Sequence, residues 1–264
     1  MNGSVAGSRQ TGSVSRRRTR TRTTTLASAL IALAAIAAVL IAVQQPRDAD
    51  ATTAPPILPG TAAEPDTAPT AEPEPDPGTL AAQAAALPTI DESAATPDYR
   101  RDAFGEAWTD IDGNGCNQRQ DVLVRDLVDI TTDRCTVLTG TLHDRYSGQT
   151  ITFQHDRVAQ PGNPGSPGVQ IDHIVSLSAA WRGGAWAWAP ERRLAYANTL
   201  ANLLAVDGPT NQAKSDLGPS DWMPPVETYR CTYAASYVAI ATEWTLSVAD
   251  DDRAALVSTL QSCG

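Results

Sequence analysis

A segment rich in proline, alanine, threonine and acidic residues, from Gln44 to about Pro88, limits how much of this 264-residue chain can fold. Nine prolines lie between Pro46 and Pro77. Such a composition cannot bury enough apolar surface to offset chain entropy, so we expect an extended, disordered linker over residues 44–88. Its Ala-rich end, residues 80–87, could form a short helix. The folded domain is therefore expected over residues 89–264, a usual size for one domain.

The N-terminal end has the layout of an export signal. Residues 1–25 contain six arginines and no acid, and the 18 residues from Leu26 to Val43 carry no charge. This pattern is typical of a secretory signal peptide or of an uncleaved signal anchor, and both remain open. In either case residues 1–25 stay cytoplasmic and the domain is exported. We expect a protein that is secreted or held at the outer face of the cytoplasmic membrane through residues 26–43.

Four cysteines lie in the expected domain: Cys116, Cys135, Cys231 and Cys263. An exported chain enters an oxidising compartment, so an even count predicts two disulfides. Proximity in sequence favours Cys116–Cys135 and Cys231–Cys263, although three pairings are possible. A structural zinc site is the alternative, but the chain lacks the Cys-x-x-Cys spacing that such sites commonly use.

Residue patterns predict an α+β domain. An amphipathic helix is expected over 121–128, a hairpin from strands 136–142 and 150–153, and a loop over 160–168. A strand is expected over 169–175 and a short one over 202–206, with a helix starting near residue 211. Between them, residues 178–200 look helical, with breaks at 183–184 and 189–190. Two further helices are expected over 229–246 and 251–260.

Five polar residues stand out within the Ala-, Leu- and Val-rich later part of the chain: Asp172, His173, Asn202, Asn211 and Lys214. Lys214 is the single lysine, and His173 is one of three histidines. If the two expected strands pair and the helix crosses them, these side chains come together. Asp172 and Asn211 offer oxygen ligands that suit Mg²⁺ or Mn²⁺. His173 could accept a proton from water, Asn202 could orient the imidazole, and Lys214 could contact a phosphate.

The order Asp-His-Ile-Val, then Asn-Leu-Leu, then Asn-x-x-Lys resembles the HNH endonucleases, which share a ββα-metal (His-Me finger) core. The chain looks most similar to the exported bacterial subgroup related to the C-terminal nuclease domain of GmrSD-type restriction enzymes. The similarity extends to residues 114–126, 178–181, 196–198 and 221–225 and to Cys231. The resemblance implies metal-dependent hydrolysis of phosphodiesters, with Asp172 and Asn211 as metal ligands and His173 as general base. Asn202 matches the middle asparagine of the family and Lys214 a phosphate contact.

Two positions depart from the family pattern. Asn211 stands where histidine is frequent and is the weaker metal ligand, which bears on metal affinity. Ser176 stands where proline is frequent after the Asp-His run, which bears only on local strand geometry.

The charge balance disfavours a broad nucleic-acid surface. Residues 89–264 hold 13 arginines and lysines against 23 acids, so the domain carries the whole chain's net charge of −10. A polyanion would need a local positive site or a metal ion. The candidate substrate-binding residues nearest in sequence to the motif are Lys214, Arg182, Arg192 and Arg193.

Other features have structural interpretations beside functional ones. Residues 110–115 resemble the start of a calcium loop, but the glutamate expected at its last position is replaced by Asp121, and an Asp/Gly-rich turn explains them as well. Arg119 and Arg125 could support the site through buried ion pairs or line a solvated helix. The tryptophans at 181, 186, 188 and 222 could stack on bases, although packing is the commoner role.

Two functions fit the sequence. The first is an exported, divalent-metal-dependent endonuclease, expected to act as a monomer and to prefer DNA over RNA. The alternative is a non-catalytic cell-surface binding module displayed on the flexible linker. The acidic balance favours the module, and the ordered five-residue pattern favours the nuclease.

Overall fold

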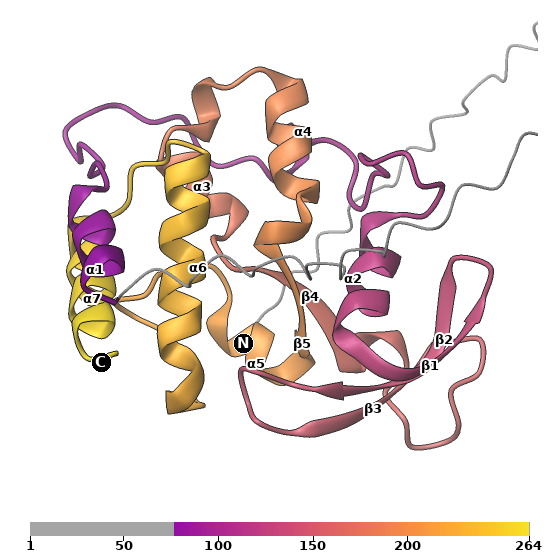
Figure 1. Cartoon of the computed structure of the whole chain (residues 1–264). Helices are drawn as coiled ribbons and strands as arrows, with labels where there is room; N and C mark the ends of the chain where they lie inside the picture. The colour runs from indigo at the N-terminus through magenta and orange to yellow at the C-terminus, as the bar shows by residue number, and fades with distance from the viewer. Residues whose placement is uncertain (1–76, 264) are drawn as a thin grey trace, which may run out of the picture. The chain divides into compact units, whose positions relative to one another are not determined.

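The computed structural model describes residues 77–263, which form an α+β fold (Figure 1). The expected signal segment 26–43 and most of the expected linker lie outside the described residues. The end of that linker forms helix α1, Pro77–Ala86, close to the short helix expected over 80–87. No helix within residues 77–263 has the length and apolar character needed to cross a membrane.

A three-stranded antiparallel sheet lies on one side of the fold. Its strands are β1 (Leu127–Asp133), β2 (Thr136–His143) and β3 (Thr150–Gln154), in that order. The β2–β3 hairpin confirms the prediction, with Leu142 opposite Ile151. Strand β1 was not predicted, because helix α2, Gln118–Asp126, ends earlier than the apolar pattern indicated. Asn117 begins α2 by accepting a hydrogen bond from the Gln120 amide.

The second sheet is a pair of antiparallel strands, β4 (Val169–His173) and β5 (Leu203–Asp207), as the sequence predicted. Asp172 pairs with Leu204, and His173 with Leu203. Helix α5, Gly208–Lys214, follows β5 directly and contacts both strands. It begins three residues before Asn211 because the Asp207 carboxylate accepts a hydrogen bond from the Thr210 amide and caps the first turn.

The connection between β4 and β5 is helical, with the expected interruptions. Helix α3 (Leu177–Arg182) ends at the glycine pair, where Gly184 has φ of +119°, and helix α4 (Pro190–Asn198) starts at the predicted proline. Ser176 caps α3 by accepting from the Ala179 amide. The structure thus gives Ser176, the departure from the family pattern, a role in starting a helix.

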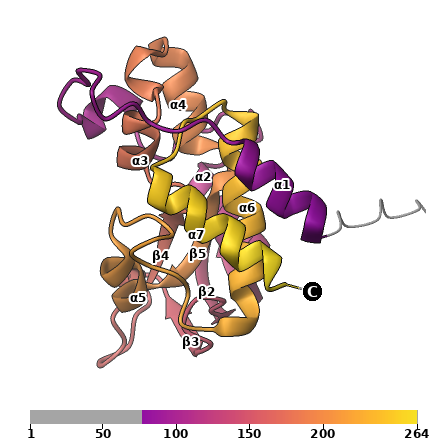
Figure 2. The same cartoon turned by 90° about the vertical axis from the view of Figure 1, so that its left-hand side faces the viewer.

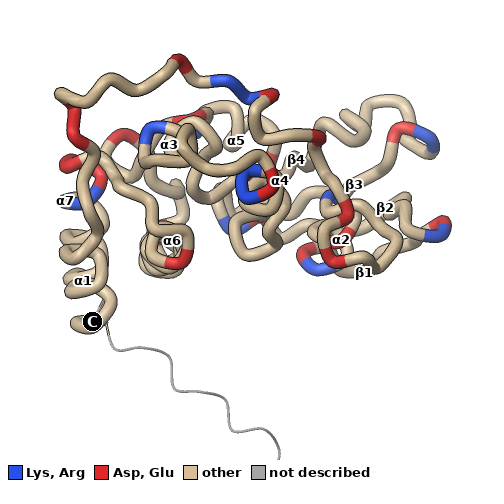
Figure 3. The backbone as a smooth tube through the Cα atoms, turned by 90° about the horizontal axis from the view of Figure 1, so that it is seen from above, with Lys and Arg blue, Asp and Glu red and all other residues tan. Residues whose placement is uncertain are grey.

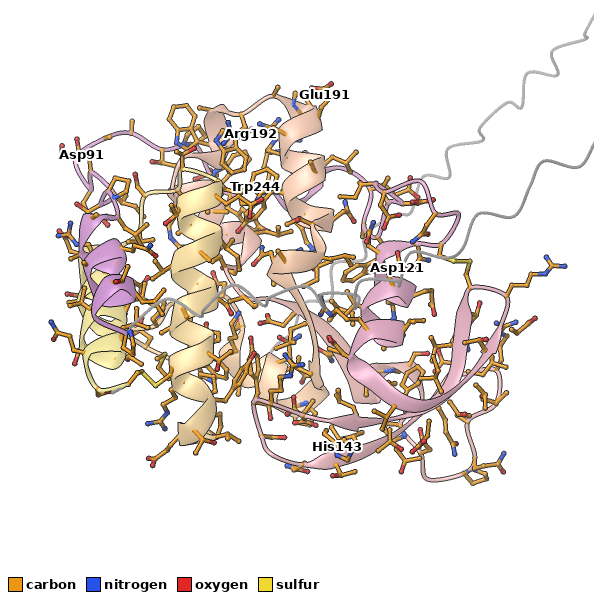
Figure 4. The ribbon with its side chains drawn as sticks, in the orientation of Figure 1. Asp91, Asp121, His143, Glu191, Arg192 and Trp244 are labelled. Carbon is orange, nitrogen blue, oxygen red and sulfur yellow. A yellow bond between two sulfur atoms is a disulfide. The ribbon has the colours of Figure 1, made fainter. Side chains whose placement is uncertain are left out.

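Two C-terminal helices complete the fold: α6 (Arg230–Glu243) and α7 (Asp250–Gln261). Helix α1 packs along α7, and α7 packs against α6, so these three helices form one layer beside β4 and β5 (Figures 1 and 2). Disulfides join Cys116 to Cys135 and Cys231 to Cys263, which confirms the pairing favoured by proximity (Figure 4). All four cysteines are therefore occupied, and the zinc alternative is wrong.

The β4–β5 pair is buried between two apolar cores. On one face, Val169, Ile171, Leu203 and Ala205 pack with residues of α2, β2 and β3, including Val122, Leu123 and Phe153. On the other face, Leu204 and Val206 pack with Tyr146 and with the helical layer, including Tyr233. Alternate residues of each strand point to opposite faces. Every residue of β5 is buried, so this short strand is the centre of the fold.

The calcium-like stretch is a turn. The Asp110 carboxylate accepts hydrogen bonds from the Gly113 and Gly115 amides at 2.7 and 2.9 Å. Both glycines have positive φ, at +74° and +88°, which suits a tight turn. The Asn114 side chain donates to Asp121 across the turn. These contacts support the structural interpretation of residues 110–115.

Candidate active site

The β4–β5 pair divides the five predicted residues between its two faces. Asp172 lies on the α5 side, and His173, the next residue, lies on the α2 side. Successive residues of a strand point to opposite faces, and β4 continues through His173, so the two side chains are kept apart.

On the α5 side, Asp172 forms a buried ion pair with Lys214. The Lys214 Nζ lies 3.0 Å from Asp172 Oδ1 and also donates to the His173 carbonyl at 2.9 Å. Asp172 Oδ2 accepts from the Tyr146 hydroxyl at 2.8 Å. Lys214 is 0% exposed and Asp172 5%. Both carboxylate oxygens are thus already engaged inside the protein.

Asn211 lies one helical turn before Lys214 and faces the same strand. Its Nδ2 donates to Gln170 Oε1 at 2.9 Å, two residues before Asp172 on β4. The three-residue spacing of Asn211 and Lys214 therefore places both on the face of α5 that covers β4, as predicted. Their partners differ, however, and Asn211 makes no hydrogen bond to Asp172.

Asp172 and Asn211 do not fit a divalent cation in this arrangement. A cation at Asp172 would lie beside the Lys214 ammonium, which repels it and already compensates the carboxylate. Burial raises the pKa of Asp172 above its ordinary value, while the Lys214 and Tyr146 contacts lower it. Within residues 77–263, no three His, Cys, Asp or Glu side chains gather as a metal site would need. The pair is arranged as a structural contact between α5 and β4.

On the α2 side, His173 is held by the end of α4. Its Nε2 lies 2.9 Å from the Ala197 carbonyl. A carbonyl only accepts, so Nε2 carries the proton and Nδ1 is left with its lone pair. The indole of Trp108 stacks on the imidazole, with ring centroids 6.4 Å apart and planes 16° apart. His173 is thereby fixed in both tautomer and orientation.

The imidazole lines a small pocket of about 40 Å³, together with Arg101, Glu106 and Trp108. Burial lowers the pKa of His173 to about 4; the Arg101 and Lys214 charges act in the same direction, and the Ala197 hydrogen bond opposes them. The side chain is therefore neutral near pH 7 and can accept a proton. A fixed neutral imidazole at a pocket has the free lone pair that a general base needs, and the lowered pKa makes it a weak base.

Asn202 does not orient the imidazole in this structure. Its Oδ1 accepts from the Val175 amide at 2.9 Å, and its Nδ2 donates to the Val175 carbonyl at 3.1 Å. The backbone carbonyl of Asn202 also accepts from the Ile174 amide. Asn202 thus extends the β4–β5 pairing by two residues, and the Ala197 carbonyl takes the orienting part that the sequence assigned to Asn202.

The three predicted arginines lie outside the pocket beside His173. Arg193 donates to the backbone carbonyls of Ala103 and Trp188. Arg192 lies over the Trp188 ring at 4.4 Å and donates to the Trp244 carbonyl, at the upper ends of α4 and α6 (Figure 4). Arg182 donates to Ser178 and lies 3.8 Å from Asp216. Arg192 and Arg193 serve packing here, and Arg182 is half-exposed beside an acid.

Charge along the described backbone is mixed. Basic positions occur singly or in pairs among more numerous acidic ones (Figure 3). The tryptophans are largely packed as well. Trp181 packs against Phe104, and Trp188 packs against Tyr196. Trp222 packs against Tyr146. Any nucleic-acid contact in residues 77–263 would therefore depend on a local site rather than on a broad basic face.

Sequence reasoning missed three residues around the site: Arg101, Trp108 and Tyr146. Tyr146 lies in the turn between β2 and β3, yet it is fully buried and its hydroxyl donates to Asp172. Arg101 and Trp108 precede β4 by more than 60 residues and belong to no periodic pattern. The available indication was an aromatic and basic stretch, residues 99–108, directly before the cysteine-bearing turn.

Comparison with known proteins supplies a family. The model of the C-terminal domain of GmrSD restriction endonucleases matches residues 118–259. An uncharacterized secreted protein of Arthroderma benhamiae is 38% identical over 168 residues, which cover 62% of this chain and 76% of that protein. No solved structure gives a significant match. The family match covers β4, β5 and α5 but stops short of Arg101 and Trp108.

Proposed function

Because this chain belongs to the family of GmrSD restriction endonuclease C-terminal domains, we propose that it is an exported endonuclease that hydrolyses phosphodiester bonds, with DNA as its preferred substrate. Family membership supports the nuclease class, and the secreted relative and the two disulfides support export. The family relation to HNH enzymes and the ββα-metal core remain parts of this proposal, supported by the antiparallel β4–β5 pair followed directly by α5.

The placement of His173 carries the proposal. In the proposed reaction, Nδ1 accepts a proton from water while the water oxygen forms a bond to phosphorus. The bond from phosphorus to one sugar oxygen breaks, and that oxygen takes a proton from solvent. The Ala197 carbonyl keeps the Nε2 proton in place and so leaves Nδ1 as the basic nitrogen. Trp108 and the surrounding pocket limit the motion of the ring.

Restriction endonuclease domains typically use divalent metal ions, so a requirement for Mg²⁺ or Mn²⁺ belongs to the proposal. A metal ion would supply charge neutralisation at the phosphate. Asp172 and Asn211 are not arranged to hold it, and we assign no ligand. Lys214, buried against Asp172, is likewise assigned to support of β4 rather than to phosphate binding.

Nicking of supercoiled plasmid by the purified full chain tests the proposal. We expect cutting with Mg²⁺ or Mn²⁺ and none with EDTA. His173→Ala should lower the rate by about 10²- to 10⁴-fold, the usual contribution of a general base. The matched control is His143→Ala, since His143 is exposed on β2 (Figure 4). Intact DNA and RNA under all metal conditions, or equal rates for the two variants, would contradict the assignment.

A non-catalytic cell-surface binding module is the second candidate. The net charge of −10 and the engagement of Asp172 by Lys214 favour it. Such a module would cut nothing under any metal condition. The same plasmid assay therefore separates the two functions.

A further inference from the structure

Residues 99–108 form one wall of the pocket beside His173. The segment contains a short 3₁₀ turn, Arg101–Phe104, that anchors it to the domain. Phe104 is 2% exposed and packs against Trp181 and Tyr196. Arg193 of α4 donates to the Ala103 carbonyl at 2.8 Å. The wall is therefore held on the same helix, α4, whose Ala197 carbonyl holds His173.

A close approach at Gly105 fixes the direction of this segment. Gly105 has φ of +81°, and a Cβ there would come 2.8 Å from Leu194 Cδ1 on α4. The positive φ is the condition that favours glycine, since the Leu194 methyl is the end of a flexible side chain and can shift. The turn carries the chain from the buried Phe104 toward Trp108, which stacks on the imidazole. Arg101 and Trp108 are thus brought to the same small pocket.

Arg101 is an exposed cation at that pocket. Within residues 77–263 it forms no ion pair with a carboxylate, whereas its neighbour Arg100 pairs with Asp102 at 2.6 Å. Its charge is close enough to His173 to oppose protonation of the ring. In a domain with a large excess of acids, such a positive group beside a candidate base is a local site of the kind a polyanion would need.

The size of the pocket assigns a place to each reactant. A volume of about 40 Å³ has room for one or two water molecules, and the pocket is open on one side, so a phosphodiester can approach its mouth. Water can therefore occupy the space beside His173 while the phosphate lies at the mouth. An arginine guanidinium binds two phosphate oxygens at once, which orients the phosphorus as well as attracting it. Glu106 also lines the pocket, so Arg101 must outweigh one carboxylate.

We propose that Arg101 binds the scissile phosphodiester at the mouth of the pocket and positions it for attack by water activated at His173. The inference rests on the proposed function, since it takes His173 as the base. It assigns substrate binding to a residue outside the segment matched by the family model. Arg101, and not Arg182, Arg192 or Arg193, is then the principal phosphate contact.

The test compares Arg101→Ala with Arg100→Ala, two exposed arginines that are adjacent in sequence. For each variant of the full chain, kcat/KM is measured with a fluorescent DNA oligonucleotide. Binding of the same oligonucleotide is measured by anisotropy in a His173→Ala background, where cutting is expected to be slowed by at least about 100-fold. A charge-assisted contact of this kind is worth about 10- to 100-fold. We expect such a loss in both assays for Arg101→Ala, and less than about 3-fold for Arg100→Ala.

Arg101→Lys separates charge from geometry. A lysine keeps the charge but lacks the planar fork, so binding should be largely kept while kcat falls. Glu106→Gln should keep or strengthen binding, since it removes a repelling carboxylate. Equal effects of Arg101→Ala and Arg100→Ala in an active enzyme would overturn the inference and leave the proposed function standing. If the wild-type chain cuts nothing, the proposed function fails, and unchanged binding by Arg101→Ala would then reject the phosphate site as well.

Discussion

The Asp172–Lys214 pair shows that the role of a motif residue depends on the partner it finds in the fold. In sequence, Asp172 is an oxygen ligand beside a histidine. In the structure it is the buried partner of the single lysine, with Tyr146 on its second oxygen. A buried carboxylate needs such compensation, because an unpaired charge in the interior is costly. The pair therefore stabilises the contact of α5 with β4, and this stability can be measured.

Lys214→Met should lower the free energy of unfolding by about 3 to 5 kcal/mol, because it leaves Asp172 charged and buried without its cation. Adding Asp172→Asn should recover part of the loss. Urea unfolding measures both. The control is Arg157→Ala, which breaks an exposed pair with Asp133 and should cost at most about 1 kcal/mol. Similar losses for the buried and the exposed pair would show that Lys214 is not a structural partner.

The pKa of His173 makes stability depend on pH. The folded protein keeps the imidazole neutral down to a pKa of about 4, whereas the unfolded chain protonates near 6.5. The unfolded state therefore binds the proton first as the pH falls, and stability is lost between about pH 6.5 and 4. Between pH 7 and 4.5 the loss should be roughly 2 to 3 kcal/mol.

His173→Gln should remove this part of the pH dependence, and His143→Gln should not, because His143 is exposed. Urea unfolding of the three proteins at both pH values isolates the histidine from the carboxylates, which titrate in all of them. A wild-type loss no larger than that of His173→Gln would contradict the buried, neutral imidazole.

At the level of elements, sequence patterns predicted most of the core of the candidate site. Strands β4 and β5 are short apolar runs bounded by turn residues, and α5 follows a capping aspartate. Helix breaks at Gly183 and Pro190 were also predicted, because glycine and proline interrupt a helix through their own backbone, whatever packs around them. Strand β1 was missed because only Leu127 of its seven residues is buried. Its structure depends on pairing with β2, which no local pattern encodes.

The division of the site between two faces could be recognised only in part. Alternation along β4 separates Asp172 from His173 wherever the strand continues, but the sequence does not say where the strand ends. Tertiary contacts decide where the strand ends. The Asn202 side chain forms hydrogen bonds with both the amide and the carbonyl of Val175, and so continues the pairing. The roles of Ala197, Trp108 and Arg101 likewise come from long-range packing, which a pattern of residue types does not specify.

Asn202→Ala should therefore act on the β4–β5 pair as a whole. It leaves the buried Val175 amide without its acceptor, whereas the Val175 carbonyl keeps the Tyr196 hydroxyl as a donor, so the expected loss is about 1 to 3 kcal/mol. Cutting should fall with it, because His173 lies two residues away on the same strand end. Asn163→Ala, in an exposed loop where the side chain donates to Thr152, serves as control. Loss of cutting at unchanged stability in urea would instead support the direct orienting role expected from the sequence.

At the scale of the described domain, the two disulfides join different parts of the fold around the candidate site. Cys116–Cys135 joins the turn before α2 to the β1–β2 connection, with a sequence separation of 19. Cys231–Cys263 joins the start of α6 to the end of α7, with a separation of 32. The first borders the segment that carries Arg101 and Trp108, and the second closes the helical layer. Their removal should accordingly have different consequences.

Replacing Cys231 and Cys263 together by serine should lower the free energy of unfolding by roughly 3 to 4 kcal/mol, from the entropy of the reopened loop. The contacts of His173 are made by β4, α4 and Trp108, none of which this bridge joins. The rate of nicking at 25 °C should therefore stay within about 2-fold of wild type, while the midpoint of urea unfolding falls.

The matching replacement of Cys116 and Cys135 by serine has a similar predicted cost in stability, but it also frees the turn that follows Trp108. It should raise KM, because Arg101 and Trp108 are then less well held at the pocket. Equal effects of the two replacements on KM would show that the pocket wall does not depend on its neighbouring disulfide.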